Sequence, residues 1–248
     1  MAKVSKTISK NISKRKFLSG GALTATAAAV STFNIATSPA KAQMASMDAS
    51  SGLKTGMMKP MTYTELPGFL SAAQIAPHYD NHYGGALKGH LALDKQIEEM
   101  TASGTRNGAA YATMQRGRTT RGNSALLHEV YFDGMTAGAS DPAANIRAAI
   151  EARFGSIDKW QEDFAAASGS ANGWAVLALN KISGKLYNVV SDAHADGVFW
   201  QAVPIIALDM YEHSYYVDYQ NNKGAYIGKF FDYVNWDSAE KRLNEATS

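Results

Sequence analysis

The chain contains no cysteine, and this absence restricts its chemistry. Disulfide bonds, thiolate nucleophiles, iron-sulfur clusters and cysteine-type zinc sites are all excluded. Any metal ion that the protein binds must therefore be held by histidine, aspartate or glutamate. The sequence also lacks a run of about 20 uninterrupted apolar residues, so we expect no permanent transmembrane helix.

Acidic residues are missing from the first 42 positions, which distorts the overall charge. Seven of the 24 Lys and Arg residues lie in this segment, so the rest of the chain carries 17 basic and 22 acidic residues. A negative remainder without clustered Lys and Arg excludes nucleic acid as an expected partner. The content of 46% hydrophobic and 10% aromatic residues is typical of a globular protein with an ordinary core.

The first 42 residues have the layout of a signal peptide. A basic stretch ends in SKRKFL at residues 13–18, a mildly apolar run follows at 20–30, and a small-x-small cleavage site lies at 40–42. The basic stretch resembles a twin-arginine (Tat) signal with lysine in place of the first arginine. We therefore expect a periplasmic or secreted protein exported by the Tat pathway. The general secretory route and a disordered basic tail are the alternatives.

Residues 43–62 show no periodicity and predict a flexible leader. Four methionines of this segment, Met44, Met47, Met57 and Met58, could bind copper(I) through their thioethers. Because no motif is repeated, we favour a simple linker.

Helical patterns dominate residues 63–140 and predict an N-terminal α-hairpin domain. Ser71 is a good N-cap for a first helix, on which His78 and His82 share one face before Gly84 and Gly85 break it. A second helix is expected at about 124–134, with an apolar stripe beside His128.

Residues 141–248 predict a C-terminal α/β domain, which makes the whole an α+β fold. Asp141 and Pro142 are expected to start a helix that ends at Phe154, and Ser156 to cap the next one. Period-two patterns then predict a three-stranded antiparallel sheet from 174–179, 185–190 and 203–209, followed by helices at 212–221 and 223–235 and a polar helical tail.

The candidate metal ligands include six histidines: His78, His82, His90, His128, His194 and His213. A single histidine in a helix is more often a surface or core residue than a ligand. Imidazoles four residues apart, as in the pair at 78 and 82, can reach one ion, but exposed pairs of this kind are common. Spacing alone therefore leaves metal binding and a structural role equally open.

The segment around Asp209 combines a strand with a following acid and histidine. Its Asp209-Met-Tyr-Glu212-His213 run resembles the aspartate-x-tryptophan-glutamate-histidine signature of iron/manganese superoxide dismutases, with Tyr211 in place of tryptophan. Matching landmarks lie at 78–83 (HYDNHY), 154–156 (FGS), 172–174 (NGW), 215–219 (YYVDY) and 234–236 (VNW). The resemblance covers about residues 64–238 in family order.

The resemblance implies a single redox metal, one iron or manganese ion per chain. His78, His128, Asp209 and His213 would be its ligands, with a solvent molecule completing the site. Three imidazoles and a carboxylate suit either ion. The implied activity is the conversion of superoxide to oxygen and hydrogen peroxide as the metal alternates between its trivalent and divalent states.

Further roles follow from the resemblance alone. His82 matches a gateway histidine, and Tyr131 and Trp174 match aromatic residues that wall the metal cavity. Glu212 and Tyr216 match residues that bridge two subunits, so a homodimer is expected. Ordinary core packing is the alternative for these aromatic residues.

The sequence departs from the family pattern beside the site. The gateway tyrosine expected four residues after His82 is replaced by Ala86. The glutamine expected to bind the metal-bound solvent is absent, since Ser124 occupies one of its two usual positions and His194 is found at the other. We therefore take His194 as the candidate replacement, against a surface-loop histidine as the alternative.

Two rival functions stay open. One is an exported protein of this family that binds metal without efficient dismutation, which the loss of the gateway tyrosine favours. The other is a different metalloenzyme on the same scaffold, such as a hydrolase or an oxygenase.

Overall fold

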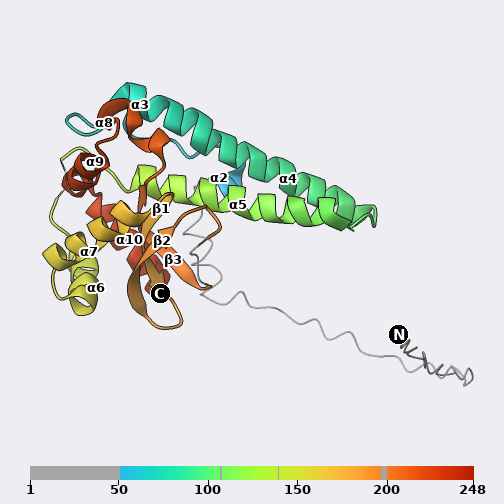
Figure 1. Ribbon diagram of the computed structural model, residues 1–248. Coiled ribbons are helices and arrows are strands. Elements are labelled where there is room, and N and C mark those ends of the chain that lie inside the picture. Colours follow the sequence, from blue (N-terminus) through green and yellow to red (C-terminus); the bar gives the residue numbers. More distant parts are fainter. Residues whose placement is uncertain (1–50, 107, 139, 197–199) are drawn as a thin grey trace, which may run out of the picture. The chain divides into compact units, whose positions relative to one another are not determined.

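The computed structural model describes residues 51–106, 108–138, 140–196 and 200–248. The expected signal peptide and residues 43–50 of the leader lie outside these described residues. Two long antiparallel helices form the N-terminal half, and a small sheet with shorter helices forms the C-terminal half (Figure 1). The predicted α+β architecture is therefore confirmed.

The second part of the leader packs against the long helices, which differs from the expected flexible linker. Ser51 caps the short helix α2 (Gly52–Thr55), and the backbone N–H of Gly52 donates to the carboxylate of the buried Glu129 at 2.8 Å. The N–H of Lys59 donates to the hydroxyl of Tyr83, also at 2.8 Å. These partners lie far along the chain, so the composition of the leader could not indicate them.

A continuous helical rod carries the first histidines. It comprises α3 (Ala72–Pro77), the π-helical turn η1 (His78–Tyr83) and α4 (Gly84–Ala102), and Ser71 caps its start as predicted. The expected break at Gly84 is wrong, because this residue keeps helical dihedral angles. A Cβ at Gly84 would lie 2.9 Å from the sulfur of Met58, so the glycine makes room for the leader.

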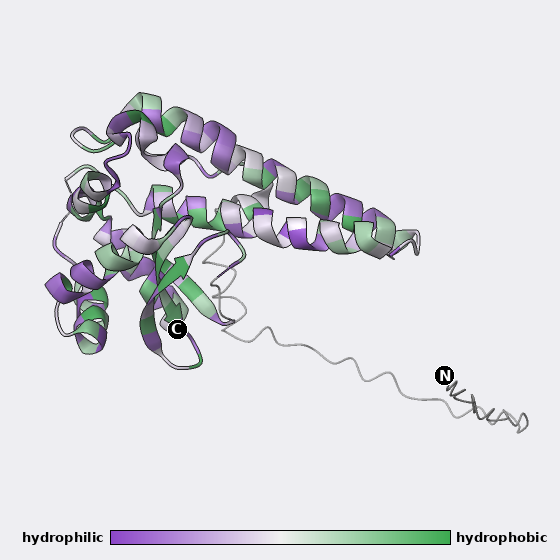
Figure 2. Cartoon of the chain, in the orientation of Figure 1, coloured by the Kyte–Doolittle hydropathy of each residue, from purple (hydrophilic) through white to green (hydrophobic). Residues whose placement is uncertain are grey.

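The partner helix α5 (Gly108–Asp133) is much longer than the predicted 124–134. Its first half is polar and only partly buried, so it has no apolar stripe that could reveal it. Arg118 in this half pairs with Asp94 of α4 at 2.8 Å. Figure 2 shows the resulting mixture of hydrophilic and hydrophobic residues along both helices.

The sheet has the order β2-β1-β3 and is antiparallel throughout. Its strands are β1 (Trp174–Asn180), β2 (Lys185–Ser191) and β3 (Ala202–Asp209), as the period-two pattern predicted. The central strand β1 is buried along its whole length. Its neighbour β3 ends at Asp209, which delivers this carboxylate to the base of the helical hairpin.

Helices cover the sheet and complete the core. They are α6 (Ala144–Phe154), α7 (Ile157–Ser170), α9 (Lys223–Phe230) and α10 (Trp236–Thr247). The predicted start of α6 at Asp141 and Pro142 is too early. Glu240 of α10 accepts hydrogen bonds from the N–H groups of Asn145 and Ile146, and this carboxylate takes the place of a local N-cap.

The predicted helix over 212–221 is wrong as a continuous element. The chain instead forms the 3₁₀ turn η2 (Glu212–Ser214) and the single-turn helix α8 (Tyr216–Tyr219), while η3 (Phe231–Tyr233) follows α9. The hydroxyl of Ser214 donates to the carbonyl of Asp209 at 2.7 Å, which folds the segment back on the end of β3. Gln220 ends α8 with a φ of 51°.

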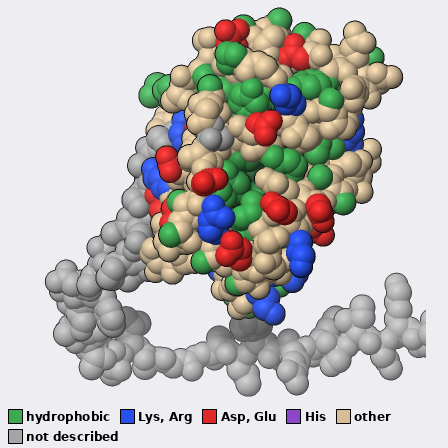
Figure 3. Space-filling view, turned by 90° about the vertical axis from the view of Figure 1, so that its left-hand side faces the viewer, with side chains coloured by type: hydrophobic (Ala, Val, Ile, Leu, Met, Phe, Trp, Pro, Cys, Tyr) green, Lys and Arg blue, Asp and Glu red, His purple; other side chains and the backbone are tan. Residues whose placement is uncertain are grey.

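The surface on the left of Figure 1 mixes acidic, basic and hydrophobic side chains, as Figure 3 shows. Among the described residues, no helix combines the length and the apolar character needed to cross a bilayer.

Candidate metal centre

Four separate elements bring the predicted ligands together. His78 comes from η1, His128 from α5, Asp209 from the end of β3 and His213 from η2. One potential ligand atom from each residue lies within 4.8 Å of the others, and three of the four residues are buried. The fold therefore assembles the set that the resemblance implied, from positions up to 135 residues apart.

One carboxylate oxygen is the common neighbour of the three imidazoles. Asp209 Oδ2 lies 3.1 Å from Nε2 of His78, 3.3 Å from Nε2 of His213 and 3.6 Å from Nε2 of His128. The Nε2 atoms of His128 and His213 are buried and have no hydrogen-bond partner in the described structure. Buried polar atoms without partners are rare, and their arrangement around a carboxylate fits a cation bound between these groups.

Neighbouring groups fix the orientation of two ligands. The Nδ1 atom of His128 lies 2.7 Å from the carbonyl of Ser124, and since a carbonyl only accepts, this nitrogen carries the proton. The Nε2 atom then presents a lone pair toward the Asp209 carboxylate. The second oxygen of Asp209 accepts the N–H of Tyr211 at 2.9 Å. The lone pair of His128 Nε2 and the carboxylate oxygen of Asp209 face each other, and a cation between two such acceptors stabilises both. The residues therefore fit a bound metal ion.

The protonation states also suit metal binding. Burial lowers the pKa of His128 to about 3, and it likewise lowers the pKa of His78, so both imidazoles are neutral at pH 7. Burial alone would raise the pKa of Asp209, but its interactions with His213 and His78 lower that pKa and keep the carboxylate ionised. Neutral imidazole and ionised carboxylate are the forms that ligate metals.

Aromatic side chains surround the four ligands. Trp174 meets the ring of His128 edge-on, with ring centroids 5.1 Å apart. Tyr131 lies 5.1 Å from the ring of His78, and its hydroxyl is 3.1 Å from that of Tyr226, which donates to the backbone carbonyl of Asp209. Tyr131 and Trp174 thus pack against ligand imidazoles, and their role as walls of the metal cavity stays a prediction.

His82 and His194 lie beside the cluster but outside the set of four. His82 stacks on His213 with centroids 3.6 Å apart and an interplanar angle of 9°, and burial lowers its pKa to about 4. His194 accepts a hydrogen bond from the indole N–H of Trp174 at 2.9 Å, and its ring is 6.3 Å from that of His128. This half-buried position is not that of a free surface histidine.

Glu212 and Tyr216 lie at the surface and belong neither to the set of four nor to its cavity. Glu212 is exposed, and Tyr216 is 49% exposed beside Val217, which is 59% exposed. Neither residue touches the cavity, so their predicted role between subunits stays a prediction. The sixth histidine, His90, lies elsewhere along α4 and contacts the carbonyl of Arg118.

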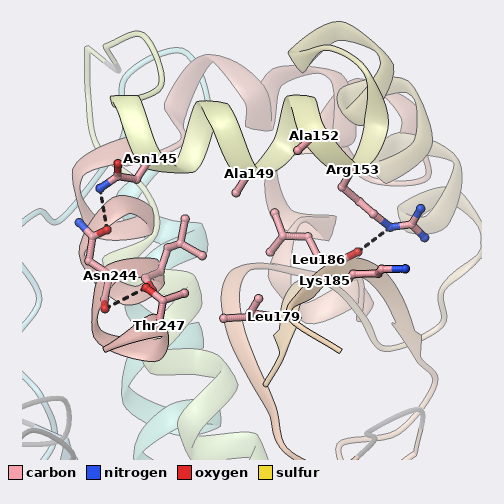
Figure 4. Close-up of a pocket in the computed structure, with 11 residues that line it drawn as sticks. Asn145, Ala149, Ala152, Arg153, Leu179, Lys185, Leu186, Asn244 and Thr247 are labelled. Carbon is pink, nitrogen blue, oxygen red and sulfur yellow. Dashed lines mark hydrogen bonds between the residues drawn. The ribbon is translucent and has the colours of Figure 1, made fainter. Parts of the chain in front are cut away.

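A cavity of about 500 Å³ opens onto the cluster. His82, His128, His194 and His213 line it together with both departures from the family pattern, Ala86 and Ser124. A second cavity, of about 540 Å³, lies between α6, α10 and the β1-β2 turn (Figure 4). The described residues that line it include no histidine or acidic residue, and its Arg153 donates to the carbonyl of Leu186, so it offers no metal ligands.

Several supporting residues escaped the sequence analysis. Gln74 donates to the backbone carbonyl of His213 at 2.6 Å and accepts the N–H of Val217, and thereby joins α3 to the segment that carries the last ligand. Tyr226 supports Asp209 as described above. The sequence feature that could have indicated Gln74 is its position four residues before His78, because this spacing places both residues on one helical face.

Comparison with known proteins identifies the family of the chain. The family profile described as the C-terminal domain of iron/manganese superoxide dismutases matches residues 142–242. Superoxide dismutase [Mn] 2 of Haloferax volcanii is 35% identical over 188 residues, which cover 75% of this chain and 94% of that protein. The chain belongs to the iron/manganese superoxide dismutase family.

Iron-type relatives of the superoxide dismutase family match equally well. Superoxide dismutase [Fe] of Cupriavidus metallidurans is 37% identical over 184 residues, with 71% of this chain and 90% of that protein covered. Superoxide dismutase [Fe] of Aquifex pyrophilus is 33% identical over 186 residues, with 71% and 85% covered. Because relatives of both metal types occur, family membership supports one iron or manganese ion without choosing between them.

Proposed function

We propose that this protein is a superoxide dismutase that holds one iron or manganese ion through His78, His128, Asp209 and His213. The observation that carries the proposal is the convergence of three imidazole Nε2 atoms on one Asp209 oxygen, with two of them buried and unpaired. The resemblance to the family implies the same four residues as ligands.

The reaction converts two superoxide anions and two protons into oxygen and hydrogen peroxide. Iron or manganese, when bound, supplies the one-electron couple that this reaction needs. The residues of the chain keep the imidazoles neutral, hold the carboxylate ionised and surround the site with Trp174 and Tyr131. The cavity gives the small anionic substrate access past His82 and His194.

The test is elemental analysis of the purified protein, with dismutation assayed on the same sample. We expect about one iron or manganese per chain together with activity. The variant His213→Ala should lose both the metal and the activity, whereas the control variant His90→Ala should keep both, because His90 lies outside the site. Normal metal content in His213→Ala would contradict the site assignment.

The same measurement separates the rival functions. A zinc-loaded protein without superoxide activity would support a hydrolase on this scaffold. An iron- or manganese-loaded but inactive protein would show that the loss of the gateway tyrosine converted the family member to metal binding. Growth with either metal in excess, followed by reconstitution of the metal-free protein, identifies which ion supports activity.

We also propose a homodimer whose interface includes Glu212 and Tyr216. The support is their exposure next to Val217, together with the resemblance of both residues to subunit-bridging positions. Light scattering should give twice the mass of the mature chain, and Tyr216→Ala should shift the protein toward monomer. A wild-type monomer at micromolar concentration would contradict this proposal.

Export is a further proposal, supported by the layout of residues 1–42. We expect the mature protein to begin at Gln43 and to be periplasmic or secreted. N-terminal sequencing of protein from fractionated cells tests both statements. Replacement of Lys14 and Arg15 by glutamine should block export if the Tat machinery recognises this stretch, while retained export would favour the general secretory route.

A further inference from the structure

The cavity above the candidate metal centre has a one-sided charge. Apart from its histidines, its described lining consists of small or uncharged polar residues and a single guanidinium, that of Arg121. No acidic side chain is among the described lining residues. A cleft lined by charge of one sign concentrates counter-ions and raises their rate of association.

Arg121 is exposed, and its side chain lies against α4 rather than in an ion pair. It extends from α5 across Gly89 of α4, where an added Cβ would lie 2.5 Å from its Cδ and 2.7 Å from its Nη1. By contrast, Arg118 of the same helix forms an ion pair with Asp94. Among the described residues, no acidic group lies within ion-pair distance of Arg121, so its charge is available to a ligand.

Small residues leave the path from Arg121 to the histidines open. Gly85, Ala86, Gly117 and Ser124 line the cavity, and Ala86 stands where the resemblance leads one to expect a tyrosine. A cavity of about 500 Å³ is far larger than a diatomic anion requires. No bulky side chain among the described lining residues therefore separates the guanidinium from His82 and His213.

We propose that Arg121 forms an anion-capture subsite at this cavity, which draws the anionic substrate toward the metal centre and selects against neutral molecules of similar size. The inference rests on the proposed dismutase function and deepens it. Arg121 acts before the electron-transfer step and takes no part in holding the metal. Gly89 is the positioning residue that lets the arginine lie across α4.

The first test compares Arg121→Gln with Arg121→Lys and with Arg116→Gln. Arg116 is an exposed arginine of the same helix that does not line the cavity, so its variant controls for the loss of one positive charge. At low ionic strength, kcat/KM of Arg121→Gln should fall about fivefold. This factor corresponds to about 1 kcal/mol, the attraction between two unit charges about 4 Å apart in water. Arg121→Lys should keep most of the activity.

Two further readouts separate capture from general damage. The decrease of kcat/KM with added salt should be much weaker in Arg121→Gln than in the wild type, because salt screens the attraction that the variant has lost. Azide, a small anion used as an inert probe, should bind the metal-loaded variant about fivefold more weakly in calorimetric titration. Metal content and melting temperature should stay at wild-type values.

The variant Gly89→Ala tests the placement without changing any charge. The added methyl group should displace the Arg121 side chain and so reproduce the loss of azide affinity. Alanine has a higher helix propensity than glycine, so the substitution should not weaken α4 itself. Equal effects of Arg121→Gln and Arg116→Gln on the salt dependence and on azide binding would overturn the capture subsite. A metal-loaded wild type without dismutation would refute the proposed function instead, and azide binding would still report on the subsite.

Discussion

Tyr83→Phe is the sharpest test of how the leader and the long helices stabilise each other. The Tyr83 hydroxyl is buried, donates to the Glu129 carboxylate at 2.8 Å and accepts the N–H of Lys59 at 2.8 Å. Burial, and then the charge of Glu129, raise the pKa of Tyr83, so the hydroxyl keeps its proton at neutral pH. The substitution removes only this oxygen and leaves the ring in place.

The expected magnitude follows from the two lost hydrogen bonds. A bond to a charged group contributes about 1.5–3 kcal/mol and a neutral one about 0.5–1.5 kcal/mol, so we expect a loss of about 2–4.5 kcal/mol. For a domain of this size, about 2–4 °C of melting temperature corresponds to each kcal/mol, which gives a decrease of about 4–18 °C.

The assay is thermal unfolding followed by circular dichroism on protein with a measured metal content. Tyr111→Phe is the matched control, because the Tyr111 hydroxyl is only partly buried and accepts one neutral hydrogen bond from Gln115. The control should unfold within about 1 kcal/mol of the wild type. If Tyr83→Phe is no less stable than Tyr111→Phe, the inference that the hydrogen bonds of Tyr83 tie the leader to the long helices is refuted.

Three other predictions test the site and its supports. Glu240→Gln should lower the free energy of unfolding by about 1 kcal/mol in urea titration, because its carboxylate binds the N-terminal N–H groups of α6; an unchanged midpoint would contradict this role. Removal of the metal by chelation should lower the melting temperature, because metal present at 100 times its dissociation constant stabilises the folded protein by about 2.7 kcal/mol; re-addition should restore it. Trp174→Phe removes the hydrogen bond to His194, so dismutation should fall while metal content is retained; unchanged activity would show that the orientation of His194 is unimportant.

Local patterns sufficed for the elements whose stabilisation is local. The period-two sequence pattern predicted all three strands, and Ser71 and Ser156 cap the helices that they were expected to start. The four ligand positions could be proposed because the family signature fixes them along the chain. For the strands and caps the information lies within a few neighbouring residues, whereas the ligand set came from the resemblance over about residues 64–238.

Long-range partners explain what the sequence could not predict. The leader folds because Glu129 and Tyr83, about 25 to 80 residues away, satisfy its backbone. The start of α6 depends on Glu240, some 95 residues downstream. The first half of α5 has too few buried residues to show a helical period, and the Arg121–Gly89 contact joins two helices with no signal in either one.

The order of the ligands along the chain has a consequence for how the protein matures. Two ligands come from the helical hairpin, and the other two lie at 209 and 213 of 248 residues, so the hairpin alone supplies only two of the four ligands. A nascent chain cannot complete the site until most of it has left the ribosome. Every molecule therefore passes through a stage in which its metal site is incomplete.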